Sequence, residues 1–244
     1  MTKPIHHAAL LFAMQDEAMP LIRRLELADK GHLAPPMPMR WYDGAIDRLR
    51  IDVVVMGADR RFGIDCIATQ PAAVATQLVL DKLEPDLLIN AGTCGGFIKR
   101  GGAIGKVYLT GGPFYFHDRR IPLAPFEKYA DGGWILSDVT AWAKRLELEQ
   151  GVVSSGNSLD MAPEDAERIE RVGTHAKDME AASIAWVADQ HEKPLCAVKA
   201  VTDLVDGEHP THEEFERHLH TASEALSETV EKLLRLLASP EHEA

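Results

Sequence analysis

The chain has 244 residues, 45 % of them hydrophobic, so it can bury the core of one large α/β domain or two small ones. Its formal net charge of −12 at pH 7 argues against nucleic acid and against an anionic membrane surface as partners. The three cysteines are far apart and form no CxxC pair, which is typical of a reduced protein without a cysteine zinc site. The N-terminus lacks the apolar core of a signal peptide, and no apolar run approaches the ~20 residues of a membrane helix, so we expect a cytoplasmic protein.

The first half of the chain predicts alternating strands and helices. Residues 29–43 contain Gly31 and several prolines, so we expect a loop there. The glycine-rich stretch 91–96 follows a short apolar run, and a turn of this kind can bring backbone N–H groups close to a ligand oxygen. The regular elements expected here are a strand at 8–13, a helix at 18–27, a strand within 48–56, a helix at 69–82 and a strand at 86–90.

The second half continues the same alternation. Thr211 and Glu214 have the spacing of a capping box at the start of the C-terminal helix, and Ser137 is the expected cap of an earlier helix. The alternation predicts one α/β domain over residues 1–244, without a linker. The elements expected here are a strand at 105–110, an irregular segment at 123–134, a helix at 137–148, a strand from 152, a helix from 162, a helix at 180–189, a strand at 195–201 and a helix from 211.

Two carboxylates flank the last of these strands and the helix before it. Glu180 opens the helix at 180–189, and Asp203 follows the strand at 195–201. Ligands of open α/β sheets bind at helix N-termini and at the carboxyl ends of strands, so the two side chains are expected to meet at one cleft. Taken alone, Asp203 could equally cap a turn.

Five stretches follow one another along the chain: AMQDEAMPL near the N-terminus, NAGTCGGF at 90–97, SSGNSLDM at 154–161, KDMEAA at 177–182 and KAVTDLVDG at 199–207. In this order they resemble the nucleoside phosphorylase superfamily, and most of all the 5′-methylthioadenosine nucleosidases, some of which also act on S-adenosylhomocysteine. The shorter stretches HDRRIP, SLDM and AVTDLVDGEHPTHEEF resemble the plant-type branch. The resemblance covers roughly residues 8–237 and is weakest at 29–63.

The resemblance implies a single-domain α/β fold with a central mixed sheet, partly barrel-like and flanked by helices. It implies hydrolysis of an N-glycosidic bond to release adenine and a 5-alkylthioribose, without a metal or an organic cofactor. It also implies a homodimer in which the partner subunit closes part of each site, with residues 114–126 as candidates for that contribution.

The resemblance also implies a role for each matching residue. Asp203 would be the acid that protonates adenine N7, which requires a raised pKa of the kind that burial produces. Glu17 would activate the attacking water, and Glu180 would bind the ribose 2′- and 3′-hydroxyls. Met179 would pack on the sugar. Thr93, with its neighbours Cys94 and Gly95 in the glycine-rich turn, would help to hold the water or the sugar.

Two further residues are assigned to the base. The backbone around Asp160 would hydrogen-bond adenine. Leu159 lies where many bacterial members of the family have a stacking Phe, so the surface against the base would be aliphatic here.

Three alternatives remain open. A phosphorylase of the same fold would need cationic groups for phosphate, for which Arg60, Arg61, Arg119 and Arg120 are candidates. Glu17 argues against it, because a carboxylate repels a dianion. A related 6-aminopurine nucleosidase would share the same residues. A non-catalytic nucleoside-binding protein is the third alternative, and the presence of Glu17, Glu180 and Asp203 argues against it.

Overall fold

A buried parallel centre organises the sheet in this computed structural model, which describes residues 4–239. Its strands are nearly all apolar, and parallel strands of this kind require a helix layer on each face. In spatial order they are β4 (Leu49–Val55), β1 (His7–Phe12), β5 (Leu87–Gly96) and β11 (Leu195–Leu204).

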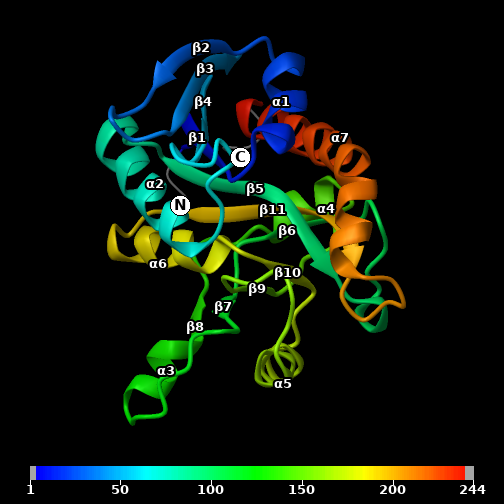
Figure 1. Ribbon diagram of the computed structural model, residues 1–244. Helices are drawn as coiled ribbons and strands as arrows, with labels where there is room; N and C mark the ends of the chain where they lie inside the picture. The colour runs from blue at the N-terminus through cyan, green and yellow to red at the C-terminus, as the bar shows by residue number, and fades with distance from the viewer. Residues whose placement is uncertain (1–3, 240–244) are drawn as a thin grey trace.

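Two helix layers cover this centre, as the alternation of side chains along β1 requires. Ala8, Leu10 and Phe12 pack toward one layer, and Ala9 and Leu11 pack toward the other. Figure 1 shows α7 along one side of the sheet, with α2 and α6 on the opposite side. The layers are α1 (Gln15–Arg24) with α7 (Thr211–Ala238), and α2 (Thr69–Leu83) with α6 (Ala181–Gln190).

The expected loop at 29–43 is wrong, because this region contains an antiparallel hairpin. Strands β2 (Ala28–His32) and β3 (Arg40–Ile46) extend the sheet beyond β4. The prolines that indicated a loop all lie in the turn between the two strands, where they remove no hydrogen bond from the ladder. The hairpin therefore adds an outer edge to the sheet in the region of weakest family resemblance.

The expected glycine-rich turn at 91–96 is also wrong, since β5 continues through it as a strand. Its glycines pair with β11 on one side, and Gly95 and Gly96 pair with β10 (Ala176–Asp178) on the other. A Cβ atom on Gly95 would lie 2.8 Å from Asp203 Oδ2 and 2.6 Å from Val205 Cγ2. The glycine thus permits a close approach of two strands at this point.

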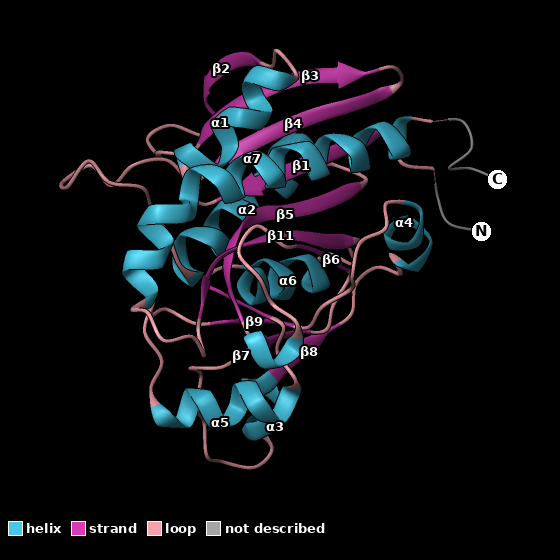
Figure 2. Ribbon diagram, turned by 90° about the vertical axis from the view of Figure 1, so that its right-hand side faces the viewer, coloured by secondary structure: helices cyan, strands magenta, loops and turns pink. Residues whose placement is uncertain are grey.

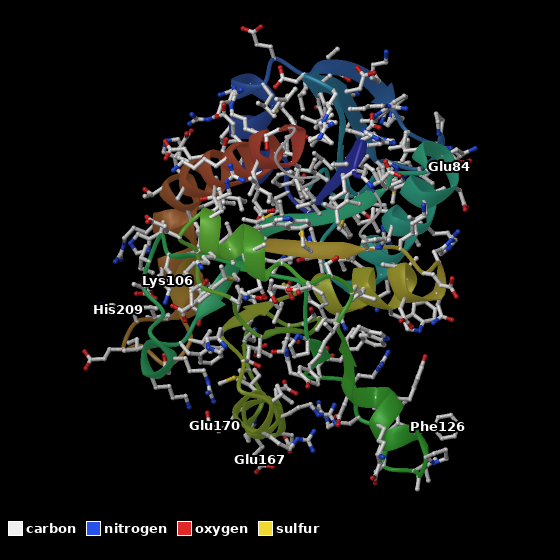
Figure 3. All side chains as sticks on the ribbon, turned by 180° about the vertical axis from the view of Figure 1, so that it is seen from behind. Glu84, Lys106, Phe126, Glu167, Glu170 and His209 are labelled. Carbon is white, nitrogen blue, oxygen red and sulfur yellow. The ribbon has the colours of Figure 1, made fainter. Side chains whose placement is uncertain are left out.

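The segment expected to be irregular, 123–134, contains a helix and a strand. In Figure 3 Phe126 lies on the projecting helix α3. The remaining elements of this half are β6 (Val107–Thr110), β7 (Phe114–Phe116), α3 (Phe126–Asp131), β8 (Gly132–Trp134), α4 (Thr140–Arg145), β9 (Val153–Ser155) and α5 (Pro163–Val172), with a short 3₁₀ turn at Ile98–Arg100 after β5.

Two helix starts differ from their expected caps. Helix α4 begins at Thr140, whose N–H donates to the Asp138 carboxylate, so Ser137 is not its cap. Helix α7 begins at Thr211 without a side-chain cap. The Glu214 carboxylate accepts instead from the N–H of Leu204, because a tertiary contact replaces the local one.

The whole strand path is β2-β3-β4-β1-β5-β10-β9-β7-β8, with β11 and β6 branching from β5. The prediction of a mixed α/β fold with a central sheet flanked by helices is confirmed, and the path is open at both ends in residues 4–239. Figure 2 shows α1 and α7 lying over the sheet. Within the same residues, no helix is long and apolar enough to cross a membrane.

Candidate active site

A cavity of about 540 Å³ opens where β1, β5 and β11 end. Carboxyl ends of parallel strands are the usual place for a ligand in this class of sheet. The side chains around it come from the first turns of α1 and α7, from β5, from the β10–α6 junction and from the segment before α2. They include eight of the nine predicted site residues, namely Glu17, Thr93, Cys94, Gly95, Leu159, Met179, Glu180 and Asp203.

Glu17 is buried in the first turn of α1, directly after β1. Its Oε1 accepts from the Thr93 N–H at 2.7 Å and from the Thr93 hydroxyl at 2.6 Å. Its Oε2 accepts from the Met14 N–H at 3.2 Å. The carboxylate is therefore held against β5 by three hydrogen bonds, and it faces the cavity.

Glu180 is the residue just before α6, and only 7 % of it is exposed. Its Oε1 accepts from the N–H of Ala68, which precedes α2, at 2.8 Å. Burial, with the negative charge of Asp178 adding to it, raises the pKa of Glu180 to about 7. Near neutral pH this side chain thus exists both as an acid and as a carboxylate.

Asp178 and Lys199 form a buried ion pair behind Glu180, which sequence reasoning missed. Lys199 Nζ lies 2.7 Å from Asp178 Oδ2, and Asp178 also accepts from the Ser155 hydroxyl and the Ala181 N–H. Burial alone would lower the pKa of Lys199, but the charges of Asp178 and Glu180 outweigh it and the pKa is raised. A lone lysine in an otherwise apolar strand was the available signal, since a buried charge requires a partner.

Asp203 is 3 % exposed and lies near the end of β11, where the register against β5 shifts between Val201 and Asp203. Burial raises its pKa, although the hydrogen bond from Thr202 and the charge of Lys177 oppose the shift. The Thr202 hydroxyl lies 2.7 Å from Asp203 Oδ1 and 3.3 Å from the Cys94 carbonyl oxygen. The surroundings therefore favour a protonated Asp203 in a site that faces the cavity.

Lys177 was also missed, and it connects β10 to the segment expected to hold the base. Its ammonium donates to the carbonyls of Ser158 at 3.0 Å and Leu159 at 2.9 Å. Leu159 lines the cavity and is 43 % exposed. Asp160 is exposed and is not among the lining residues, so its expected contact with a base stays a prediction.

Three apolar side chains also line the cavity. Ile64 and Ile67 come from the segment before α2, and Phe215 comes from the first turns of α7. None of the three was predicted as a site residue. Phe215 follows an apolar three- and four-residue spacing along its helix, which predicts core packing and not a site, and the loop that carries Ile64 and Ile67 has no periodic pattern.

The comparison with known families assigns the chain to a family. A family model described as the phosphorylase superfamily matches residues 7–235. The chain belongs to the phosphorylase superfamily. The resemblance recognised in the sequence is confirmed.

Two curated relatives from Arabidopsis thaliana match nearly the whole chain. The 5′-methylthioadenosine nucleosidase is 40 % identical, over 96 % of this chain and 88 % of the relative. The 5′-methylthioadenosine/S-adenosylhomocysteine nucleosidase is 37 % identical, over 97 % and 93 %. The apo structure of the Arabidopsis 5′-methylthioadenosine nucleosidase superposes with a TM-score of 0.94, covering 96 % of this chain and 97 % of the other.

A more distant structure shares the fold alone. The futalosine hydrolase of Helicobacter pylori is 18 % identical, with a TM-score of 0.76 over 95 % of this chain and 98 % of the other.

Proposed function

We propose that this protein hydrolyses the N-glycosidic bond of 5′-methylthioadenosine, giving adenine and 5-methylthioribose. One observation carries the proposal: three buried carboxyl groups, Glu17, Glu180 and Asp203, face one cavity, and burial favours the protonated form of Asp203. The Arabidopsis nucleosidases, at 37–40 % identity over nearly the full chain, support the same reaction.

Asp203 supplies the proton in this reaction. Adenine leaves poorly as an anion and well as a neutral base, so the acid must hold its proton until the bond to the sugar breaks. The raised pKa of Asp203 supports that role. Gly95 supports it too, because any side chain there would displace the Asp203 carboxyl.

Glu180 and Met179 bind the ribose. An ionised Glu180 accepts the two sugar hydroxyls and offsets the positive charge that develops on the ring as adenine departs. Its raised pKa of about 7 means that the ionised form predominates only above about pH 7 in the free protein. Met179 lines the cavity beside it and supplies an apolar surface for the sugar.

Glu17 receives a proton from the attacking water. It is buried, and Thr93 donates two hydrogen bonds to one of its oxygens, which leaves the carboxylate with a fixed orientation. Fixed orientation lowers the entropic part of the barrier when the water attacks the anomeric carbon.

The charges of the cavity favour water over phosphate as the nucleophile. Among the described residues that line it, Lys177 is the only cation, and its ammonium donates to two backbone carbonyls. The arginines considered for phosphate lie outside this lining: Arg120 pairs with Asp165, and Arg119 stacks on Phe116. A dianion beside Glu17 would be repelled.

The three apolar side chains of the cavity support a short 5′ substituent. Ile64, Ile67 and Phe215 suit a methylthio group, whereas the amino acid of S-adenosylhomocysteine would need charged partners. We therefore expect a preference for 5′-methylthioadenosine over S-adenosylhomocysteine.

The proposal includes a cytoplasmic homodimer of single-domain subunits. Exposed apolar side chains support an interface, since large contiguous apolar surface on a protein marks contact sites. Phe62 and Ile64 are 67 % and 64 % exposed, and Leu123 and Phe126 are 64 % and 52 % exposed on the projecting part that contains α3. Sedimentation at several protein concentrations tests the dimer.

The deciding experiment is adenine release from 5′-methylthioadenosine with and without phosphate, with S-adenosylhomocysteine assayed in parallel. Release without phosphate is the expected result. Release only with phosphate would make the protein a phosphorylase, and no release from any adenine nucleoside would favour a binding role.

A further inference from the structure

The backbone on each side of Asp203 is bound by side chains of α7, Glu214 and His218, to which the proposed reaction assigns no role. The ladder between β5 and β11 changes register between Val201 and Asp203, so the sheet alone does not hold this part of the strand in regular pairing. The carbonyl of Thr202 and the N–H of Leu204, which flank the acid, both find partners on α7.

Glu214 binds the N–H of Leu204, on the C-terminal side of the acid. Its Oε2 accepts from the Leu204 N–H at 2.8 Å, and the side chain is only 6 % exposed. A carboxylate that is this buried costs free energy unless it is hydrogen-bonded, so its contact with Leu204 is a strong constraint on the strand.

His218, one helical turn further along α7, binds the Thr202 carbonyl on the N-terminal side of the acid. Its Nδ1 lies 3.1 Å from the Thr202 carbonyl oxygen. A carbonyl can only accept, so Nδ1 must carry the hydrogen and donate it. Residues four apart share one face of a helix, and one face of α7 thus brackets the backbone of Asp203 on both sides.

The same two groups change the charge around the acid. The titratable groups that face Asp203 are Lys177 from β10, Cys94 from β5, and Glu214 and His218 from α7. Among the smaller influences on the pKa of Asp203, Glu214 raises it and His218 lowers it, in addition to the dominant effect of burial.

Two neighbours on α7 face the cavity itself. Thr211 and Phe215 line it, while Glu214 and His218 hold the strand beneath. The start of α7 therefore forms part of the cavity wall and holds the acid in place at the same time.

We propose that Glu214 and His218 are positioning residues, which fix Asp203 relative to the base by binding the backbone on each side of it. The proposal rests on the function proposed above. Neither residue contacts the reacting atoms, so both act on the rate through Asp203.

The test compares four variants by kcat, KM and the pH dependence of kcat. Glu214→Ala is expected to lower kcat about ten- to hundredfold with little change in KM, because small displacements of a catalytic group have effects of this size. Glu214→Gln retains an acceptor for Leu204 and should recover most of kcat at low pH. The fall of its kcat on the alkaline side should begin at lower pH, because the charge that raised the Asp203 pKa is gone. His218→Asn keeps a donor and should retain kcat, whereas His218→Ala should lose it.

Glu213→Ala is the matched control, because Glu213 lies on the same turn, carries the same charge and is exposed. It should keep the parental kcat and pH profile. Parental kcat in Glu214→Ala, or equal losses in Glu214→Ala and Glu214→Gln with an unchanged pH profile, would overturn the positioning role. Melting temperatures separate loss of fold from loss of rate.

A second measurement needs no turnover and separates this proposal from the proposed function. The Asp203 carboxyl is titrated by carbon-13 NMR in the parent and in Glu214→Gln, with Asp203→Asn identifying the signal. A lower pKa in Glu214→Gln supports the contact even if the parent released no adenine. An identical pKa would overturn the influence of the Glu214 charge on the acid, and the positioning role would then be decided by the kcat of Glu214→Ala.

Discussion

Asp52 and Asp203 are both buried aspartates, and their surroundings give them opposite properties. Asp52, in β4, accepts from the Trp41 indole at 2.7 Å and contacts the His7 ring and the Arg50 guanidinium. Burial alone would raise its pKa, but these partners outweigh burial and lower it. Asp203 accepts one side-chain hydrogen bond, from Thr202, and burial raises its pKa.

The opposite pKa shifts distinguish a carboxylate with a structural role from one suited to acid catalysis. Asp52 lies among β1, β3 and β4 and does not line the cavity, so its charge is used to satisfy neighbouring donors. Asp203 lines the cavity, and its raised pKa favours the protonated form that the proposed proton transfer requires. Burial alone therefore does not identify a catalytic acid, and the number of donors around the carboxyl does.

The largest expected effect is that of Asp203→Asn. We expect kcat for adenine release to fall about a thousandfold, within the range for losing a general acid, while adenine binding measured by calorimetry persists. Asp52→Asn makes the same chemical change at the other buried site and should leave kcat near the parental value. Comparable losses in both variants would remove the distinction between the two aspartates.

The next effect is that of Glu17→Gln. We expect kcat to fall about a hundredfold or more, because an amide cannot take the proton of the attacking water. The amide oxygen can still accept from Thr93, so the circular dichroism spectrum and melting temperature should stay close to those of the parent. Recovery of adenine release on adding phosphate would show instead that the cavity admits an anionic nucleophile.

The sequence was sufficient to predict the three carboxylates of the cavity, but not the side chains that surround them. Glu17, Glu180 and Asp203 lie within motifs at strand ends and helix starts, where local pattern and position agree. The Asp178–Lys199 pair joins two strands that do not pair with each other, so no periodicity connects them. Glu214 matched the spacing of a capping box, yet it binds a strand ten residues away.

Contacts between residues far apart in the sequence also explain where the predicted secondary structure was wrong. Gly31 and the prolines favoured a loop at 29–43, but the pairing of β3 along β4 determined the structure of this segment. The glycines of 91–96 suggested a turn, whereas close packing against Asp203 and Val205 explains why a strand here needs glycine. Composition reports local preference, and long-range pairing overrides it.

An intermediate effect is expected in the pH dependence of kcat/KM. Below about pH 7 Glu180 is protonated and cannot accept both sugar hydroxyls, so kcat/KM should rise with pH through that value. At higher pH Asp203 loses the proton that it must donate, so kcat/KM should fall again. Glu180→Gln should abolish the rising limb, and a rising limb that survives in that variant would assign it to another group.

The smallest effects concern stability, where the two aspartates should differ in sign. The pKa of Asp52 is lowered by folding, so its contribution is present above the unfolded pKa and is lost as pH falls through the folded pKa. Asp52→Asn should thus lower the melting temperature at pH 7 by about 2–4 °C per kcal/mol lost, with a smaller deficit in acid.

The pKa of Asp203 is raised by folding, so its contribution is present below the unfolded pKa and is lost as pH rises through the folded pKa. Above that value the parent carries an unfavourable buried charge that Asp203→Asn lacks. The variant should therefore melt at a slightly higher temperature than the parent at pH 8, and this advantage should vanish at pH 4. Scanning calorimetry of both variants from pH 4 to 8 measures the two slopes. Slopes of the same sign would mean that the two carboxyls sit in equivalent electrostatic surroundings, and the acid in the cavity would need another explanation.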